Sequence, residues 1–384
     1  MIMQRRDFLQ GALILAAPRA GRGAGKFDLA AIDRRRVLAA AERYLAEQPV
    51  TVTASSCPRS AGGQHDFFSE GDYWWPDPNN PEGPYIQRDG MTNPDNFVEH
   101  RRAMIRLSLI APALAAAYKL TGKRAYAQHA ARHLRAWFVD GATRMNANLQ
   151  YAQAIKGRYT GRGTGMIDTV HLVEVARAAS HLDLPAADSD GVKQWFADYL
   201  EWIATHPYGI LERDAKNNHG TCWAAQALAF AQLTANREIM AYCRDRFKTV
   251  LIPNQEGLDG GFPEELRRTK PYGYSLFNLD AMSMLAQMLT IPGDNLWKWQ
   301  LSDGRGMAKA AAYMYPYVLD KKTWPFQPDV MYDGQWPVRQ PFLLFAGLAL
   351  DKPEYLALWR KLDPDPAVEE VRRNFPFRQP LLWV

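Results

Sequence analysis

Apolar residues recur at intervals of three and four residues along almost the whole chain, which is the spacing that places them on one face of an α-helix. The clearest stretches are residues 30–46, 99–120, 123–138, 169–182, 192–205, 219–233, 237–251 and 276–289. Further stretches of the same kind follow at residues 306–317, 340–350 and 353–362. No run of alternating apolar and polar residues is long enough to indicate a sheet. The pattern therefore predicts an all-α protein.

Short turns separate these stretches, as at residues 120–123, where a glycine directly follows an amphipathic segment. Helices joined by short connections pack as antiparallel hairpins, either in a bundle or in a closed α/α toroid. The chain shows no fixed-period repeat of the kind that solenoids carry. The sequence pattern leaves the bundle and the toroid open as alternatives.

The first 20 residues differ from the rest of the chain. Arg5 and Arg6 precede a short apolar run at residues 11–17, and small residues follow it. This order resembles a twin-arginine export signal, and the apolar run is too short to span a membrane as a helix. A frayed arm with two chance arginines is the alternative. We expect residues 1–20 to be removed, residues 21–384 to form a single domain without a transmembrane helix, and the protein to be periplasmic or secreted.

The charge and cysteine content limit the partners. The 46 Lys and Arg residues exceed the 41 Asp and Glu residues, and part of this excess lies in the predicted signal. A small positive charge is compatible with an anionic substrate, but the absence of polybasic runs argues against nucleic acid or a membrane surface. The three cysteines lack metal-ligand spacing, and one disulfide or three free thiols are both compatible with them. We expect no metal or other cofactor.

Aromatic residues gather in proline-rich loops, outside the helical pattern. Trp74 and Trp75 stand in the segment Tyr73-Trp74-Trp75-Pro76-Asp77-Pro78, and Arg88 follows in the same long loop. The C–H face of a sugar packs well on an aromatic ring, and a guanidinium group pairs well with a carboxylate. Such residues also pin long loops to a protein body. We expect Trp74, Trp75 and Arg88 to contribute to a substrate cleft.

The segment Lys216-Asn217-Asn218-His219-Gly220-Thr221 stands directly before an apolar helical stretch. Free N–H groups and the positive end of the helix dipole favour an anion at a helix N-terminus. Asn218 and His219 are therefore candidates for binding a carboxylate. The alternative is that an asparagine only caps the helix and that His219 is an ordinary first-turn residue.

Cations and tyrosines cluster at residues 264–278, just before the predicted helix at 276–289. Arg267, Arg268 and Lys270 lie close in sequence to Tyr272 and Tyr274. Positive charge favours a phenolate, so we expect the pKa of a tyrosine in this cluster to be lowered from about 10. The alternative is that the arginines solvate a loop and the tyrosines pack it.

These segments together resemble the alginate lyase superfamily of α/α-toroid polysaccharide lyases. The resemblance is carried by Asn218-His219 at the start of a helix, by Glu265-Leu266-x-Arg268, and by Tyr274 just beyond. Similar segments extend from about residue 66 to residue 350, namely 73–78, 148–153, 167–172 and 336–341. Cys222 departs from the pattern, because some relatives carry a tyrosine there. The resemblance implies a toroid or incomplete barrel of about six to seven helical hairpins with long aromatic-rich loops.

The resemblance also implies roles. Asn218, His219 and Arg268 would neutralise the carboxylate of a uronate, and Tyr274 would take the C5 proton and return it to the leaving oxygen. The further residues expected to bind this anionic polysaccharide are His171, Trp74, Trp75, Arg88, Gln153, Arg267, Tyr272 and Arg339. His171 is either the second base needed for guluronate, a substrate ligand or a core histidine. The expected substrate is a β-1,4-linked polymannuronate or glucuronan, because its C5 hydrogen and C4 oxygen share one face and allow syn elimination.

Two other functions are compatible with parts of the pattern. A glycoside hydrolase on a similar helical toroid would need two facing carboxyl groups. The available carboxylates do not form a recognisable pair, the candidates being Asp66, Asp72, Asp77, Glu264 and Glu265. A non-catalytic uronate-binding protein would use the aromatic loops and arginines without needing a tyrosine near Asn218-His219.

Overall fold

A computed structural model describes residues 27–384 of the chain. Its long helices are α1 (Leu29–Tyr44), α2 (Glu99–Thr121), α3 (Arg124–Phe138), α4 (Leu172–Ala179), α5 (Ala186–Thr205), α7 (Asn218–Thr234), α8 (Arg237–Arg246), α11 (Pro271–Leu289), α12 (Met307–Leu319), α13 (Pro341–Ala349) and α14 (Pro353–Lys361). Each stretch with helical periodicity forms a helix, so the prediction of an all-α fold is confirmed. The predicted export signal at residues 1–20 lies outside the described residues.

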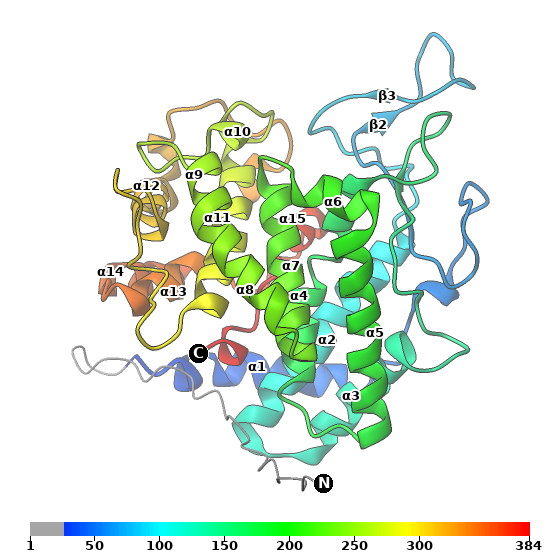
Figure 1. The fold of residues 1–384 in the computed structure, drawn as a ribbon, viewed down its shortest axis with the longest axis horizontal. Helices are drawn as coiled ribbons and strands as arrows, with labels where there is room; N and C mark the ends of the chain where they lie inside the picture. The colour runs from blue at the N-terminus through cyan, green and yellow to red at the C-terminus, as the bar shows by residue number, and fades with distance from the viewer. Residues whose placement is uncertain (1–26) are drawn as a thin grey trace, which may run out of the picture.

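The long helices form two layers (Figure 1). The inner layer runs through α2, α4, α7, α11 and α13, each of which contacts the next. The outer helices pack on this row, α1 and α3 against α2, α5 and α8 against α7, α12 against α11 and α13, and α14 against α13. The inner helices α7 and α11 are buried along most of their length, as expected for helices that are apolar on nearly all sides. This arrangement of helical hairpins is that of an α/α toroid.

Local sequence signals set several helix boundaries. The side chain of Asp28 accepts a hydrogen bond from the Ala31 amide at the start of α1, and Asn236 caps α8 through the Ile239 amide. Helix α2 ends at Gly122, whose φ of +69° is the left-handed conformation that glycine adopts at little cost. These boundaries therefore follow from residues that the sequence displays.

Helix α2 is long and apolar enough to cross a membrane, contrary to our expectation that no such segment follows the signal. Of its most apolar 18-residue window, 72% is buried inside the protein. It packs against α1, α3 and α4, and its apolar character is that of a core helix. Among the residues that the structure describes, it alone has this length and hydropathy.

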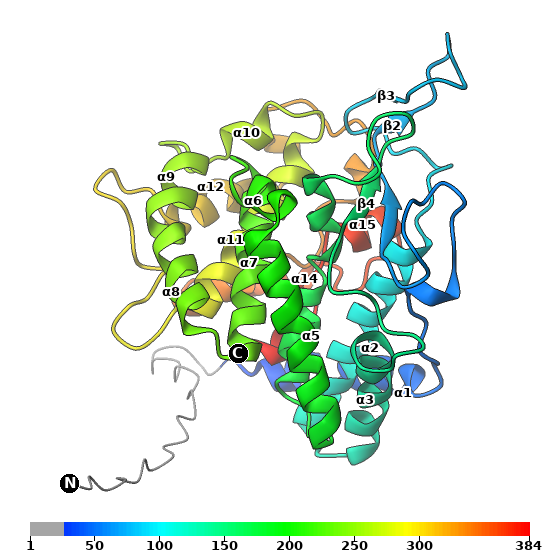
Figure 2. The same ribbon diagram turned by 45° about the vertical axis from the view of Figure 1, so that its right-hand side comes forward.

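Several short elements gather at one end of the helical body, uppermost in Figures 1 and 2. Strand β1 (Phe68–Glu70) pairs in parallel with β4 (Tyr151–Ala154), and β2 (Trp74–Trp75) pairs antiparallel with β3 (Ile86–Gln87). The short helices of this end are α6 (Pro207–Arg213), α9 (Ile252–Gln255) and α10 (Pro263–Leu266), and α15 (Glu369–Arg373) lies below them, nearer the middle of the body. The sequence pattern missed the strands and α6, α10 and α15, because each is too short to show a period.

The C-terminal segment that follows α15 packs against the inner helices α4 and α2. The backbone amides of Arg378 and Gln379 both donate to the buried carboxylate of Glu174 on α4, at 2.8 Å each. The Lys119 ammonium on α2 donates to the Leu381 carbonyl oxygen, at 2.5 Å. These hydrogen bonds fix the C-terminal segment to helices α4 and α2, which are more than 200 residues away in the sequence.

Candidate active site

A pocket of about 160 Å³ opens among the short elements. Its walls come from the loop that carries β2 and β3, the segment that begins with β4, the first turn of α7, the segment from α10 into α11, and the residues at the end of α15. The four residues expected from the sequence to carry the chemistry all line this pocket, namely Asn218, His219, Arg268 and Tyr274.

Asn218 is fixed at the start of α7 by Glu265 on α10. The Asn218 backbone N–H donates to Glu265 Oε1 at 2.7 Å, and Asn218 Nδ2 donates to Glu265 Oε2 at 2.8 Å. Asn217 caps the helix, since its side chain accepts a hydrogen bond from the His219 amide. Nδ2 carries two hydrogens, so the amide can donate to Glu265 and into the pocket at once.

His219 follows in the first turn of α7. It is held by the carboxylate of Glu212, which the sequence pattern did not indicate as part of the site. Its Nδ1 lies 2.7 Å from Oε1 of Glu212, in the last turn of α6. Burial favours the neutral ring, but Glu212 and then Glu265 outweigh this effect and raise the pKa of His219 above 6.5. The two carboxylates therefore favour the positively charged form of the ring at the helix N-terminus.

Arg268 faces the pocket, and the adjacent Arg267 does not. Nε and Nη2 of Arg268 donate to the two carboxylate oxygens of Asp89, at 3.1 and 2.8 Å. The Arg268 guanidinium carbon lies 4.6 Å from the centre of the Tyr274 ring. Arg267 is exposed and pairs with Glu264.

Tyr274 lies within the first turn of α11, which begins at Pro271, five residues before the predicted helix. Its hydroxyl oxygen is 2.6 Å from that of Tyr73. Burial raises the pKa of Tyr274 well above 10, and Tyr73 adds to this, while Arg268 acts in the opposite direction. The prediction of a lowered pKa is wrong, because only 9% of Tyr274 is exposed and the loss of hydration outweighs one guanidinium.

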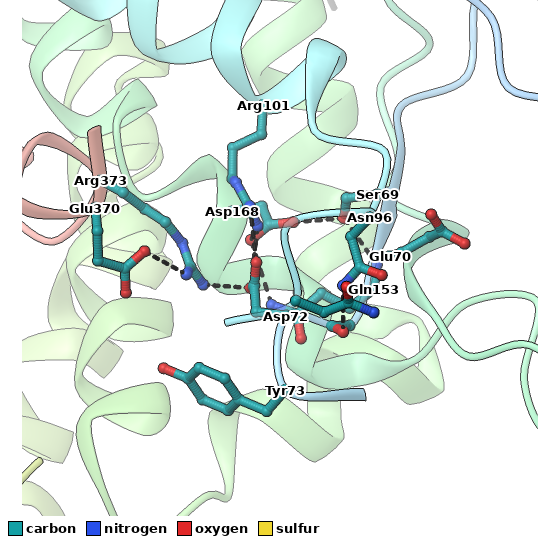
Figure 3. A network of polar contacts seen from close by, with 12 residues as sticks. Ser69, Glu70, Asp72, Tyr73, Asn96, Arg101, Gln153, Asp168, Glu370 and Arg373 are labelled. Atoms are coloured by element: carbon teal, nitrogen blue, oxygen red, sulfur yellow. Dashed lines mark hydrogen bonds and ion pairs between the residues drawn. The ribbon is translucent and has the colours of Figure 1, made fainter. Parts of the chain in front are cut away.

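A buried ionic network supports the loop that carries Tyr73 (Figure 3). Both Arg101 on α2 and Arg373 on α15 donate to the carboxylate of Asp72, at 2.7 and 2.5 Å. Glu370 pairs in turn with Arg373, at 3.3 Å. Burial alone would raise the pKa of Asp72, but the two guanidinium groups hold it below its usual value. The network anchors the loop to α2 and to the C-terminal segment.

The same network reaches Gln153, a predicted substrate ligand that lines the pocket. Gln153 has φ of +50°, which is unusual for a residue other than glycine. Arg162 stabilises this backbone by donating to the Gln153 carbonyl oxygen at 3.0 Å, and Ser69 accepts from its amide at 2.8 Å. A strained residue held in this way at a pocket is typical of a functional position.

The predicted aromatic ligands stand beside arginines at the rim. The Arg158 and Arg162 guanidinium groups lie 5.4 and 5.9 Å from the Trp74 ring, and that of Arg88 lies 5.2 Å from the Trp75 ring. Of these five residues, only Arg162 lines the pocket itself.

Three other residues predicted to bind substrate lie elsewhere. His171 is 1% exposed in the core, and burial together with nearby arginines lowers its pKa well below 6.5. Tyr272 is buried and donates its hydroxyl hydrogen to the Tyr317 carbonyl oxygen. Arg339 pairs with Asp33 and stacks on a tryptophan. None of the three lines the pocket, so their placement favours structural roles.

The sequence reasoning missed several residues that complete the site, namely Tyr73, Asp89, Arg162, Glu212, Glu265 and Arg373. Tyr73 and Glu265 stood in segments already noted, but not as contacts of Tyr274 and Asn218. Arg373 carried no signal, since it lies in a charged segment near the C-terminus. The three cysteines are buried free thiols outside the pocket.

The sequence matches a family model described as alginate lyase over residues 51–324. A solved alginate lyase from Bacteroides ovatus is 30% identical, with a TM-score of 0.78 over 92% of this chain and 93% of that one. Alginate lyase A1-III from Sphingomonas species A1 shares the fold at 14% identity, with a TM-score of 0.53 over 91% of this chain and 94% of that one. A histidine-to-alanine variant of A1-III complexed with tetrasaccharide aligns over the same shares, at 15% identity and a TM-score of 0.57. No curated protein sequence matches the chain.

Proposed function

Because the chain belongs to the alginate lyase family, we propose that it cleaves a β-1,4-linked polyuronate by syn β-elimination. The substrate is polymannuronate, as in alginate, or glucuronan. The reaction leaves a 4,5-unsaturated uronate at the new chain end. The structural neighbour alginate lyase A1-III was solved in complex with a tetrasaccharide. This supports an oligosaccharide or polysaccharide as the ligand of the present chain.

One observation carries the proposal. The hydroxyl of Tyr274, a group able to transfer a proton, shares one pocket with Asn218, His219 and Arg268, which are all able to bind a carboxylate. The pair Asn218-His219 stands at a helix N-terminus, where an anion is favoured. A binding protein would not need the tyrosine in this position.

The chemistry requires both kinds of group. The C5 proton becomes acidic only when the neighbouring carboxylate is neutralised, which is the role of Asn218, His219 and Arg268. The C5–H bond then breaks, its proton moves to the Tyr274 oxygen, and its electron pair forms the C4–C5 double bond. The C4–O bond breaks, and the leaving oxygen takes the proton from Tyr274. Tyr274 ends as it began, so no further reactant is consumed.

The raised pKa of Tyr274 determines which protonation state reacts. The phenol predominates at neutral pH, and the phenolate that removes the proton is a minor form. Arg268 favours this minor form, because its charge acts on Tyr274 against the effect of burial. Turnover should therefore rise with pH from the acid side, as long as His219 keeps its proton.

The position of His171 bears on the substrate. Guluronate has the opposite configuration at C5, so its proton must be removed from the other face of the ring. His171, the residue considered for that role, lies in the core and does not reach the pocket. This supports mannuronate or glucuronate polymers, for which Tyr274 alone serves both the C5 hydrogen and the C4 oxygen.

A hydrolase is less compatible with the carboxylates of the pocket. Hydrolysis needs a carboxylic acid that is protonated near neutral pH, opposite a second carboxylate. Asp72 and Asp89 line the pocket, but both are paired with arginines that hold their pKa below the usual value against the effect of burial. Neither can serve as the acid.

The test is to incubate the mature chain, with chelator present, with polymannuronate, polyguluronate and glucuronan separately. Elimination creates a double bond conjugated with the carboxylate, so ultraviolet absorbance should rise on polymannuronate or glucuronan. Tyr274→Phe is the control and should show no rise. New reducing ends without absorbance would indicate hydrolysis and contradict the proposal, as would cleavage of polyguluronate alone.

A further inference from the structure

We propose that Glu212 is a positioning residue that orients the His219 imidazole and keeps it cationic, so that His219 offers an N–H donor and a positive charge to the substrate carboxylate. The inference rests on the proposed elimination, in which that carboxylate must be neutralised. Glu212 does not line the pocket and acts through His219.

Glu212 and His219 differ in their exposure to the pocket. Glu212 is 1% exposed, whereas 21% of the His219 side chain is exposed and lines the pocket. Helix α6 packs against α7, and a short turn joins them. Gly220 permits this close approach, because a Cβ there would lie 2.3 Å from the Ala215 carbonyl oxygen. The carboxylate is thus held behind the ring by the turn between two helices.

The contact with Glu212 determines which ring nitrogen meets the substrate. Nδ1 lies 2.7 Å from the Glu212 carboxylate and acts as a donor to it. Within residues 27–384, no protein group is hydrogen-bonded to Nε2 of His219. A neutral ring with its hydrogen on Nδ1 would present the lone pair of Nε2 to the pocket and repel a carboxylate. Only the cationic ring donates at both nitrogens.

The charges that face His219 come from three segments. Glu212 approaches from α6, Glu265 from α10, and Arg268 from the segment that follows α10. Arg268 and burial both favour the neutral ring, but the two carboxylates outweigh them and raise its pKa. Glu265 is committed to Asn218, so Glu212 alone bonds directly to the imidazole. Removing its charge should therefore lower the pKa of His219.

Conservative variants separate charge from packing. Glu212→Gln keeps an oxygen that can accept from Nδ1 and removes the negative charge. Glu212→Asp keeps the charge on a shorter side chain. Glu264→Gln is the matched control, because Glu264 lies on α10 and pairs with the exposed Arg267. Far-UV circular dichroism would confirm that each variant is folded.

The first measurement follows the His219 ring nitrogens by NMR during a pH titration without substrate, with His219→Asn used to assign the signal. Glu212→Gln should lower the pKa of His219 by about one unit or more. Glu212→Asp should lie between that variant and the wild type, and Glu264→Gln should match the wild type. An unchanged pKa in Glu212→Gln would overturn the proposal.

The second measurement is kcat/KM against pH, on whichever polyuronate the wild type cleaves. If the cationic ring is the active form, the variant should approach wild-type kcat/KM below its own His219 pKa. Above the wild-type pKa it should be lower by the same factor as the pKa shift, about tenfold for one unit. A loss that is constant across the pH range would show a purely structural role and overturn the proposal.

The results distinguish a failure of this inference from a failure of the proposed function. If the wild type cleaves a polyuronate and the His219 pKa does not move in Glu212→Gln, the inference fails alone and the proposed function stands. If the pKa moves but the wild type cleaves none of the three polyuronates, the substrate role of the pair is overturned together with the proposed function.

Discussion

The hydroxyl oxygens of Tyr73 and Tyr274 lie 2.6 Å apart, although 201 residues separate the two tyrosines in the sequence. Tyr73 stands directly before β2, and Tyr274 lies in the first turn of α11. Only Tyr274 also packs beneath the Arg268 guanidinium, whereas the Tyr73 ring lies next to the Lys270 ammonium. The hydrogen bond joins the loop that carries β2 to the inner helix α11. The two tyrosines differ in the cation that lies next to each ring.

Replacing Tyr274 should remove the proton carrier and little else. Tyr274→Phe is expected to lower kcat by about 10³-fold or more, since proton transfer by a positioned side chain contributes roughly 10²- to 10⁴-fold. Substrate affinity should change little, because the ring and the carboxylate ligands remain. The measurements are initial rates of unsaturated-uronate formation and binding by isothermal calorimetry. Substantial turnover in the variant would exclude Tyr274 as the base.

Replacing Tyr73 should have a smaller and different effect. The hydrogen bond to Tyr73 helps to raise the pKa of Tyr274, so Tyr73→Phe should lower that pKa. We expect the alkaline limb of the pH profile to move to lower pH, with kcat reduced by less than about tenfold. The check is kcat/KM measured from pH 6 to 11. Loss of activity as complete as in Tyr274→Phe would instead make Tyr73 the proton carrier.

The adjacent arginines provide a matched pair. Arg268→Ala should reduce kcat/KM by about 10²- to 10³-fold, the usual effect of removing one electrostatic contact to the developing charge. Arg267→Ala should change it by less than about threefold, because Arg267 is exposed and its partner is Glu264, also outside the pocket. Steady-state kinetics on the two variants tests this difference. Equal losses would contradict the assignment of Arg268 to the pocket.

The buried network beneath the site should contribute to stability. Asp72→Asn leaves Arg101 and Arg373 without their shared carboxylate, and the expected loss in the free energy of unfolding at pH 7 is about 3–5 kcal/mol. The pKa of Asp72 is lower in the folded than in the unfolded protein, so its contribution is present above about pH 4 and is lost as pH falls further. Urea unfolding at pH 7 and near pH 3 measures both effects.

A surface carboxylate serves as the control for that experiment. Asp198→Asn lies on the exposed side of α5 and should change the free energy of unfolding by no more than about 0.5 kcal/mol. If Asp72→Asn were equally mild, the network would not support the loop. A difference between the variants that is unchanged near pH 3 would contradict the assigned direction of the Asp72 pKa.

The helices could be predicted because their signal is local. A period near 3.6 is present in every long helix, and a capping residue such as Asp28 directly precedes the helix that it caps. The start of α11 was placed too late, because its first turn contains Pro271 and two tyrosines in place of aliphatic residues. Tyr274 is consequently a helical residue, not part of a preceding loop.

The partners of the reactive groups could not be predicted, because they come from distant segments. Asp89 meets Arg268 across 179 residues, and Arg373 meets Asp72 across 301. Glu212 is close to His219 in sequence, but α6 is too short to show a period that would place its carboxylate behind the ring. Contacts of this kind depend on how the helices pack and not on local spacing.

The sequence by itself determined the helical architecture and indicated the candidate catalytic residues, since periodicity and residue type are properties of a local segment. The tertiary structure decided which groups meet and in which protonation state. Burial raises the pKa of Tyr274 where the neighbouring arginines in sequence predicted a decrease, and Glu212 raises that of His219. Both effects depend on distance and hydration in the folded protein, which no linear pattern records.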